Sequence, residues 1–164
     1  MLNFKIRGAL PEDFQSIIAL NAAEVVWTSP MDSAKISALH YLSSYHKVVE
    51  HNGRVVGFLL AMCSDDKYIN ENFDWFLNRY SQFVYIDRIV IDASCKGLGI
   101  GRTLYNDLFA FAERRGLQVL CCEYNLSPVN ESSKVFHTKM GFEQVGERTY
   151  TNSDKVVSMQ ATKI

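Results

Sequence analysis

Hydrophobic and polar positions repeat along this chain with two periods, and the shorter period predicts strands. Residues 4–7 alternate as a short strand does. Residues 48–60 hold two β-rich runs joined by Asn52-Gly53, the strongest short signal for a tight hairpin. Further strands are predicted over residues 86–91, 118–123, 142–148 and 155–161, the last two around a polar turn at 151–154.

The longer period predicts helices between these strands. Proline and acids at residues 11–13 begin one helix, and apolar residues recur at helical spacing after them. Residues 64–79 follow no clean period, which predicts a loop with a short helix. The other predicted helices cover residues 34–41, 102–115 and 131–140. This order predicts an α/β (α+β) fold with a mixed sheet and helices on both of its faces.

A glycine-rich turn follows the strand over residues 86–91. Gly97, Gly99 and Gly101 open an amphipathic helix, and Lys96 and Arg102 flank the turn. Glycines let successive backbone N–H groups point into one concavity, and the helix adds free amides and the positive end of its dipole. The stretch therefore predicts a phosphate-binding site.

The spacing of the glycines limits which phosphate ligand this turn could bind. A P-loop needs Lys and then Ser or Thr after its last glycine, whereas Gly101 is followed by Arg102. A dinucleotide fingerprint needs its third glycine at position 102. Arg102 at that position weakens the dinucleotide hypothesis. The hypothesis stays open because Glu123 lies about as far downstream as a ribose-binding acid does.

Two motifs resemble one enzyme superfamily. The run Lys96-Gly97-Leu98-Gly99-Ile100-Gly101 resembles the Arg/Gln-x-x-Gly-x-Gly/Ala pyrophosphate loop of the GNAT acyl-CoA-dependent N-acetyltransferases, with Lys96 in the place of Arg or Gln. Residues 130–142 are similar to the second GNAT motif, in which Asn130 precedes a helix that Gly141-Phe142 closes. The Asn-x-x-Ser-x-x-Phe-His pattern from Asn130, together with Trp75-Phe76 and residues 85–88 upstream, further resembles a bacterial subgroup of predicted acetyltransferases.

The resemblance implies a GNAT-like fold with a mostly antiparallel central sheet and acetyl-CoA as co-substrate. Amides of residues 98–102 would hold the pyrophosphate of CoA, and pantetheine would lie along the strand at Ile89 and Ile91 as an added strand. Asn130 would contact the pantetheine or its water. The implied cofactor-binding residues are Ile89, Val90, Ile91, Lys96, Gly97, Leu98, Gly99, Ile100, Gly101, Arg102, Asn130, Ser133 and Phe136.

Acetyl transfer to an amine needs a base, because a protonated amine has no lone pair with which to attack. Asp87, on the strand before the turn, and Glu123, at the end of the next strand, are the candidate bases. Asp87 could instead pair with Arg88 and fix the strand end. His137 stands where the superfamily commonly has a Tyr that protonates the CoA sulfur, so it is a candidate acid or a histidine packed on a helix.

The acceptor is less defined by the sequence. Glu24 and Trp75 are candidate acceptor-binding residues, and clustered acids between Asp65 and Asp74 favour a cationic amine. Cys121 and Cys122 are expected in the core rather than as nucleophiles, because an apolar strand raises the pKa of a thiol.

Composition excludes several classes. The 164 residues fit one domain, 1–164, and a net charge of −1 argues against nucleic acid as a partner. Four cysteines form no metal-type spacing, and no apolar run reaches membrane-spanning length, so we expect no metal and a cytoplasmic protein. The expected partners are acetyl-CoA and an amine acceptor, and a homodimer stays open. A non-catalytic acyl-CoA-binding module and a nucleotide-dependent oxidoreductase are the competing hypotheses.

Overall fold

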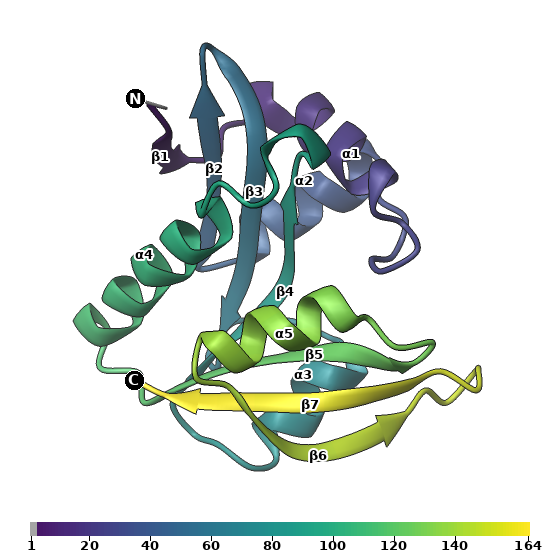
Figure 1. The fold of residues 1–164 in the computed structure, drawn as a ribbon. Coiled ribbons are helices and arrows are strands. Elements are labelled where there is room, and N and C mark those ends of the chain that lie inside the picture. The colour runs from purple at the N-terminus through teal and green to yellow at the C-terminus, as the bar shows by residue number, and fades with distance from the viewer. Residues whose placement is uncertain (1–2) are drawn as a thin grey trace.

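The computed structural model describes residues 3–164 and builds them around one seven-stranded sheet (Figure 1). The strands lie in the order β1-β2-β3-β4-β5-β7-β6. They are β1 (Lys5–Gly8), β2 (Tyr45–His51), β3 (Arg54–Cys63), β4 (Phe83–Ile91), β5 (Val119–Ser127), β6 (Glu143–Thr149) and β7 (Val156–Lys163). The helices are α1 (Phe14–Ala23), α2 (Ser33–Leu42), α3 (Glu71–Leu77), α4 (Ile100–Arg114) and α5 (Glu131–Lys139), with 3₁₀ turns η1 (Pro11–Asp13) and η2 (Ala93–Cys95).

The sheet is mostly antiparallel, which confirms the predicted fold class. Only β4 and β5 pair in parallel among these strands. The predicted hairpin joins β2 and β3, and its turn residues Asn52 and Gly53 have φ of 50° and 74°. Positive φ at both positions is what the tightest hairpin turns require, and Asn-Gly tolerates it.

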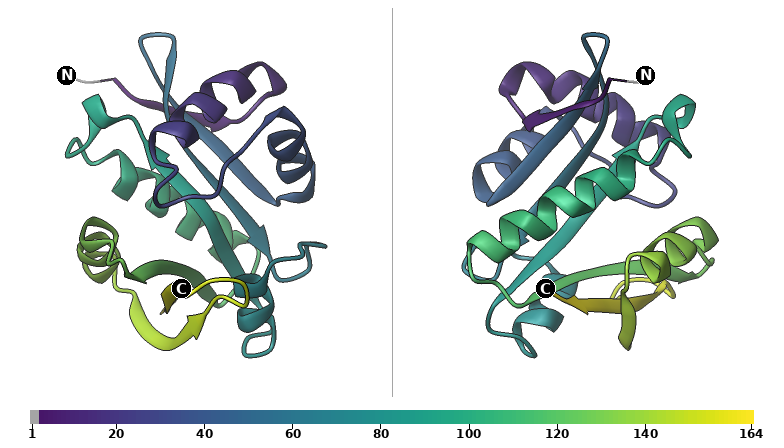
Figure 2. Two further views of the ribbon diagram at one scale, coloured as in Figure 1. Left: turned by 90° about the vertical axis from the view of Figure 1, so that its right-hand side faces the viewer. Right: turned by 60° about the vertical axis from the view of Figure 1, so that its left-hand side comes forward.

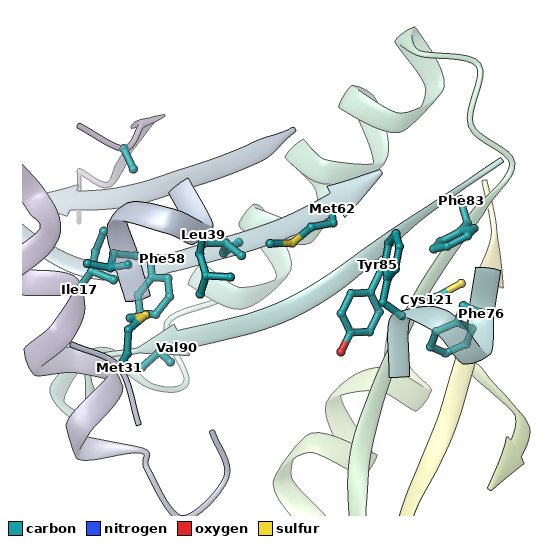
Figure 3. Close-up of a cluster of buried hydrophobic side chains, with 14 of the residues drawn as sticks. Ile17, Met31, Leu39, Phe58, Met62, Phe76, Phe83, Tyr85, Val90 and Cys121 are labelled. Carbon is teal, nitrogen blue, oxygen red and sulfur yellow. The ribbon is translucent and has the colours of Figure 1, made fainter. Parts of the chain in front are cut away.

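Helices cover both faces of the sheet (Figure 2). One core lies between the sheet and α1, α2 and α3, and it contains Ile17, Leu39 and Phe76 (Figure 3). The other core lies under α4 and is built on Leu104 and Leu108. Alternate side chains of the central strands enter opposite cores, as the two-residue period of a strand dictates.

The strand β3 shows this alternation most clearly. Phe58, Leu60 and Met62 enter the first core, whereas Leu59 and Ala61 enter the second. All five side chains are fully buried. A continuous apolar run is therefore required here, because both faces of this strand are covered by helices.

The strands β4 and β5 part soon after they meet. Their parallel pairing joins Phe83–Tyr85 to Val119–Cys121 and ends there, and Figure 1 shows the two strands diverging beyond it. On its other side β4 shifts register against β3: Leu60 is opposite Arg88, Ala61 is opposite Ile86, and Asp87 is the extra residue of a bulge. The sheet therefore opens between β4 and β5.

The predicted elements are present, and the central strands are longer than predicted: β2 begins at Tyr45 rather than 48 and β3 continues to Cys63 rather than 60. The strand β4 begins at Phe83 rather than 86, and β5 continues to Ser127 rather than 123. The aperiodic stretch contains the expected short helix, α3, whose first amides bond to the Asn70 side chain. Among residues 3–164, none of the helices combines the length and apolar composition that a bilayer span requires.

Gly57 of β3 tests how closely the strands are packed. A Cβ there would lie 2.8 Å from Ile91 Cδ1 and 3.1 Å from the Val90 carbonyl oxygen. We expect Gly57→Ala to lower the free energy of unfolding by about 1–3 kcal/mol in urea titrations, because the added methyl forces neighbours apart.

Gly8→Ala in β1 is the matched control. Its methyl group would have no neighbour within 4 Å among the described residues. The control is expected to raise the free energy of unfolding by about 0.4–1 kcal/mol by restricting the unfolded chain. Equal loss of stability in both variants would contradict close packing at Gly57.

Candidate active site

Two adjoining clefts lie where β4 and β5 part. The loop cleft, of about 490 Å³, is lined by the glycine turn, the end of β4 and one side of α5. The strand cleft, of about 360 Å³, is lined by β4, β5 and the segment after α1. Both clefts share Trp27, Ile89, Asn130, Ser133 and His137. A molecule lying in one cleft therefore reaches the other at Ile89 and His137.

The glycine turn has the backbone that its sequence predicts. Gly97 and Gly99 both have φ of 80°, and Gly99 is the N-cap of α4. The first amide of this helix to bond back is that of Thr103, which donates to the Gly99 carbonyl oxygen at 3.0 Å. The amides of residues 100–102 precede it and are free of helical partners, so they can bind an anion.

Basic side chains surround this turn. Lys96, Arg102 and Lys139 line the loop cleft, and the acid that joins them there is Glu24. Glu24 ends α1 and accepts a hydrogen bond from Lys96 across the cleft. The lining thus carries an excess of positive charge, which suits a polyphosphate. Glu24, expected to face the acceptor, lies at the loop cleft.

The remaining residues of the loop cleft lie on β4 and α5. The side chain of Val90 is buried in the first core, whereas Ile89 and Ile91 pack against the second. Phe136 lies over the start of α4, where a Cβ on Gly101 would come within 3.3 Å of its ring. Leu98 is exposed and Ile100 is buried, so only Ile100 adds to the core.

Asn130 and Ser133 hold the start of α5. Asn130 Oδ1 accepts the Ser133 N–H at 3.1 Å, which caps the helix. The amide nitrogen Nδ2 of Asn130 is left to donate into the clefts that the residue lines.

Glu123 of β5 lines the strand cleft, and only one oxygen of its carboxylate is hydrogen-bonded within residues 3–164. Its Oε1 accepts from Asn72 Nδ2 at 2.8 Å and from the Tyr85 hydroxyl at 3.0 Å, whereas its Oε2 is buried without a hydrogen-bond partner. Burial, followed by the negative charge of Asp87, raises the pKa of Glu123 to about 7. A carboxylate with this pKa can accept a proton near neutral pH.

Asp87, the other candidate base, lies in the same cleft in a different environment. Its Oδ2 accepts from Arg88 Nε at 2.8 Å and its Oδ1 accepts from the Tyr68 hydroxyl. Both members of the ion pair are 5% exposed. Arg88 also donates to Asn21 Oδ1 at 3.0 Å and to the Ser29 carbonyl oxygen at 3.2 Å. Asp87 therefore neutralises a buried guanidinium.

His137 is buried at the junction of the clefts. Its Nε2 lies 2.7 Å from the Tyr105 hydroxyl, and its Nδ1 lies 2.7 Å from the Ser133 carbonyl oxygen. The carbonyl can only accept, so Nδ1 carries the proton and Nε2 accepts from Tyr105. Burial lowers the pKa of His137 to about 4. The imidazole is therefore neutral at pH 7.

The structure does not bring Trp75 to either cleft. Its ring lies against Gly146 of β6, and the guanidinium of Arg79 lies 3.4 Å from its centre. The acidic cluster also faces elsewhere, because Asp66 accepts the Ser44 and Cys63 amides and Glu71 pairs with Arg148. These acids are committed to structural contacts, so they do not indicate a cationic acceptor.

Sequence reasoning missed the residues that fix the candidate base. Asn72 is 2% exposed, donates to Glu123 and to the Tyr150 hydroxyl, and accepts from Arg148 Nε at 2.8 Å. It lies in the same short helix as Trp75 but on the buried side. No sequence motif identifies an Asn in an aperiodic stretch. The hydrogen bond between Asn72 and Glu123, 51 positions apart, therefore had no signal in the sequence.

Cysteines and metal ligands add nothing to this site. All four cysteines are free and buried, and burial raises the pKa of Cys121 and Cys122 well above the ordinary range. Within residues 3–164, no group of three or more His, Cys, Asp or Glu side chains could hold a metal ion.

The neutral state of His137 makes stability depend on pH. Its pKa of about 4 in the folded protein lies below the unfolded value, so between these values the unfolded chain binds more protons and stability falls as the pH falls. Replacing His137 by Gln is expected to reduce the loss of unfolding free energy between pH 7 and pH 5 by about 2 kcal/mol. Urea titrations at both pH values measure the difference.

His46 provides a second test of the same effect. Burial, followed by the charge of His40, lowers the pKa of His46 to about 4 as well. His46→Gln should therefore give a similar reduction, and the double variant should show both. Glu123 titrates in the opposite sense but is present in every variant, so it cancels from the comparison. An unchanged pH dependence in His137→Gln would show that the imidazole is charged.

Solved structures share this fold along nearly the whole chain. Ard1 from Thermoplasma volcanium superposes with a TM-score of 0.79 at 18% identity, covering 98% of this chain and 97% of that one. A putative acetyltransferase from Salmonella typhimurium, solved with its cofactor acetyl-CoA, gives a TM-score of 0.73 at 21% identity over 98% and 94% of the two chains. At these identities the likeness concerns the fold.

Sequence comparison finds a relative and a family. An uncharacterized N-acetyltransferase from Methanocaldococcus jannaschii is 29% identical over 98 residues, which are 59% of this chain and 38% of that protein's length. The model of the family described as Acetyltransferase (GNAT) family matches residues 12–142, well over half of the chain. The matched residues include the glycine turn and Asn130, which both line the loop cleft. The chain belongs to the acetyltransferase (GNAT) family.

Proposed function

We propose that this protein transfers the acetyl group of acetyl-CoA to a primary amine by direct attack, with both substrates bound at once. The observation that carries the proposal is the position of Glu123, a carboxylate with a pKa of about 7, in a cleft that joins the glycine turn's cleft. Acetyl-CoA supplies a thioester to which a neutral amine can add, with release of CoA.

The loop cleft would hold the CoA portion. The amides of residues 100–102 would donate to the pyrophosphate, with Arg102 and Lys139 adding positive charge. The edge of β4 that β5 leaves after Tyr85 offers backbone groups at Ile89–Ile91 to an extended chain. Asn130 Nδ2 would donate from the opposite wall.

The strand cleft would hold the amine. Glu123 Oε2 is buried and has no hydrogen-bond partner among residues 3–164. It would first accept a hydrogen bond from the amine of the acceptor and then take the amine's proton. Asn72 and Tyr85 hold Oε1, which fixes the carboxylate in one orientation. Asp87 would act as the charge partner of Arg88 rather than as the base.

His137 would help to shape the site rather than donate a proton. Its Nε2 already accepts from Tyr105, and its pKa of about 4 leaves it uncharged at neutral pH. A thiol with a pKa of about 8.5 can leave as a thiolate without an acid to protonate it. The lack of an acid at this position favours one second candidate, a non-catalytic acyl-CoA-binding module.

Binding of CoA tests the loop cleft. A hundredfold excess of CoA over its Kd should raise the free energy of unfolding by about 2.7 kcal/mol in a thermal melt, whereas NAD should not. Gly99→Ala is expected to weaken CoA binding about tenfold, because an alanine at this positive φ costs about 1–2 kcal/mol. Leu98→Ala, at an exposed side chain, is the control and should bind CoA normally. A selective shift with NAD would favour the oxidoreductase hypothesis.

Removal of the base tests catalysis. Glu123→Gln should lower kcat by about 10²–10⁴-fold, measured as CoA release with an amine acceptor. In the unsubstituted protein, log kcat/KM should rise more steeply with pH below about 7 than above it, because Glu123 must be deprotonated to act. This change of slope should disappear in the variant.

Two further variants separate the acids. Glu113→Gln changes an exposed carboxylate on α4 and should leave kcat unchanged. Asp87→Asn leaves the buried Arg88 without its charge partner, so it should lower the free energy of unfolding by about 3–5 kcal/mol. A loss of kcat in Asp87→Asn with unchanged stability would transfer the base role to Asp87. CoA binding without turnover of any amine would support the non-catalytic module.

A further inference from the structure

The strand cleft has more positive than negative side chains in its lining. Lys35, Arg88 and Lys155 line it together with Asp87 and Glu123. Arg88 is committed to Asp87 in a buried ion pair. Neither lysine takes part in an ion pair with a carboxylate of residues 3–164. The cleft therefore presents the candidate base together with two unneutralised ammonium groups.

Lys155 lines the same cleft as Glu123. Its Nζ is 4.8 Å from the centre of the Tyr150 ring, and its carbonyl oxygen accepts the Tyr150 N–H at 2.9 Å. The Tyr150 hydroxyl accepts from Asn72 Nδ2, which also donates to Glu123. Tyr150 and Asn72 thus connect the ammonium group to the carboxylate through one ring contact and two hydrogen bonds.

Contact with Tyr150 is a small part of what Lys155 can contribute. A cation on an exposed aromatic face is stabilised less than a cation that donates a hydrogen bond to a charged partner. Lys155 is half-buried, and an anion in the cleft would complete its coordination. Glu123 Oε2 at the same time needs a donor. An amine and an anion in one molecule satisfy both groups.

We propose that the acceptor is a small free amine that carries a carboxylate, which Lys155 binds while the amine lies at Glu123 Oε2. The inference rests on the proposed function and narrows its acceptor. The volume of the strand cleft, about 360 Å³, is at the lower end of the range for ligand pockets, which suits a small molecule. Lys35 on α2 lines the same cleft and adds to its positive potential.

Pairs of amines test the inference. CoA release is measured with ω-amino carboxylates of increasing chain length and with their carboxamides, which differ only in the charge of one group. We expect kcat/KM for the best carboxylate to exceed that of its carboxamide at least about tenfold, as a charge-assisted hydrogen bond implies. The preference should shrink at high salt because screening weakens the contact.

Variants assign the preference to Lys155. Lys155→Gln should bring the ratio between carboxylate and carboxamide close to one, whereas Lys155→Arg should keep it. Lys163→Gln, at an exposed lysine near the end of β7, is the matched control and should leave the ratio unchanged. The ratio is informative even if Lys155→Gln alters the pKa of Glu123, since that change affects both acceptors equally.

The outcomes separate the two proposals. Equal turnover of carboxylates and carboxamides would overturn the inference and leave N-acetyl transfer standing. Preference for peptides with an acidic residue over every free amino carboxylate would also overturn it. If none of the carboxylates, carboxamides and peptides releases CoA, the proposed function itself fails.

Discussion

The parting of β4 from β5 is the constraint on which this structure depends. The two strands pair only from Phe83–Tyr85 to Val119–Cys121. Beyond these residues, the edge of each strand that faced its neighbour no longer pairs with it. A sheet edge inside a protein needs partners for its amides and carbonyls. The glycine turn and both clefts lie at this opening, so it gives room and backbone hydrogen bonds to a ligand.

Contacts across the opening give the two acids of the strand cleft different surroundings. Asp87, placed on a bulge, pairs with Arg88, and this guanidinium also bonds to Asn21 and Ser29 near α1. Glu123, on the other strand, has only neutral donors on one oxygen and none on the other. Burial and the charge of Asp87 raise the pKa of Glu123, and Lys155 only partly opposes them. Two acids in one cleft therefore suit different roles.

The sequence predicted the glycine turn and both acids of the strand cleft, but it did not predict the contacts that distinguish these acids. The glycine turn was predicted because its signal is local: glycines, a strand before them and a helix after them. Glu123 and Asp87 were both candidate bases, and Arg88 beside Asp87 offered that acid an alternative role as an ion-pair partner. Asn72, which fixes Glu123, was missed, and Trp75 was placed in the acceptor wall although it packs on Gly146. Asn72 and Trp75 lie on one short helix, and the side of it that faces the cleft is set by its packing against strands distant in sequence.

The sequence by itself determined the elements, the hairpin at Asn52-Gly53, the fold class and the position of the glycine turn. Each follows from periodicity or from backbone preferences that act over a few residues. The tertiary structure alone decided where the sheet opens, that His137 is neutral, and that Lys155 lines the same cleft as Glu123. These properties arise from burial and from contacts between residues far apart in the chain, and no local pattern encodes either.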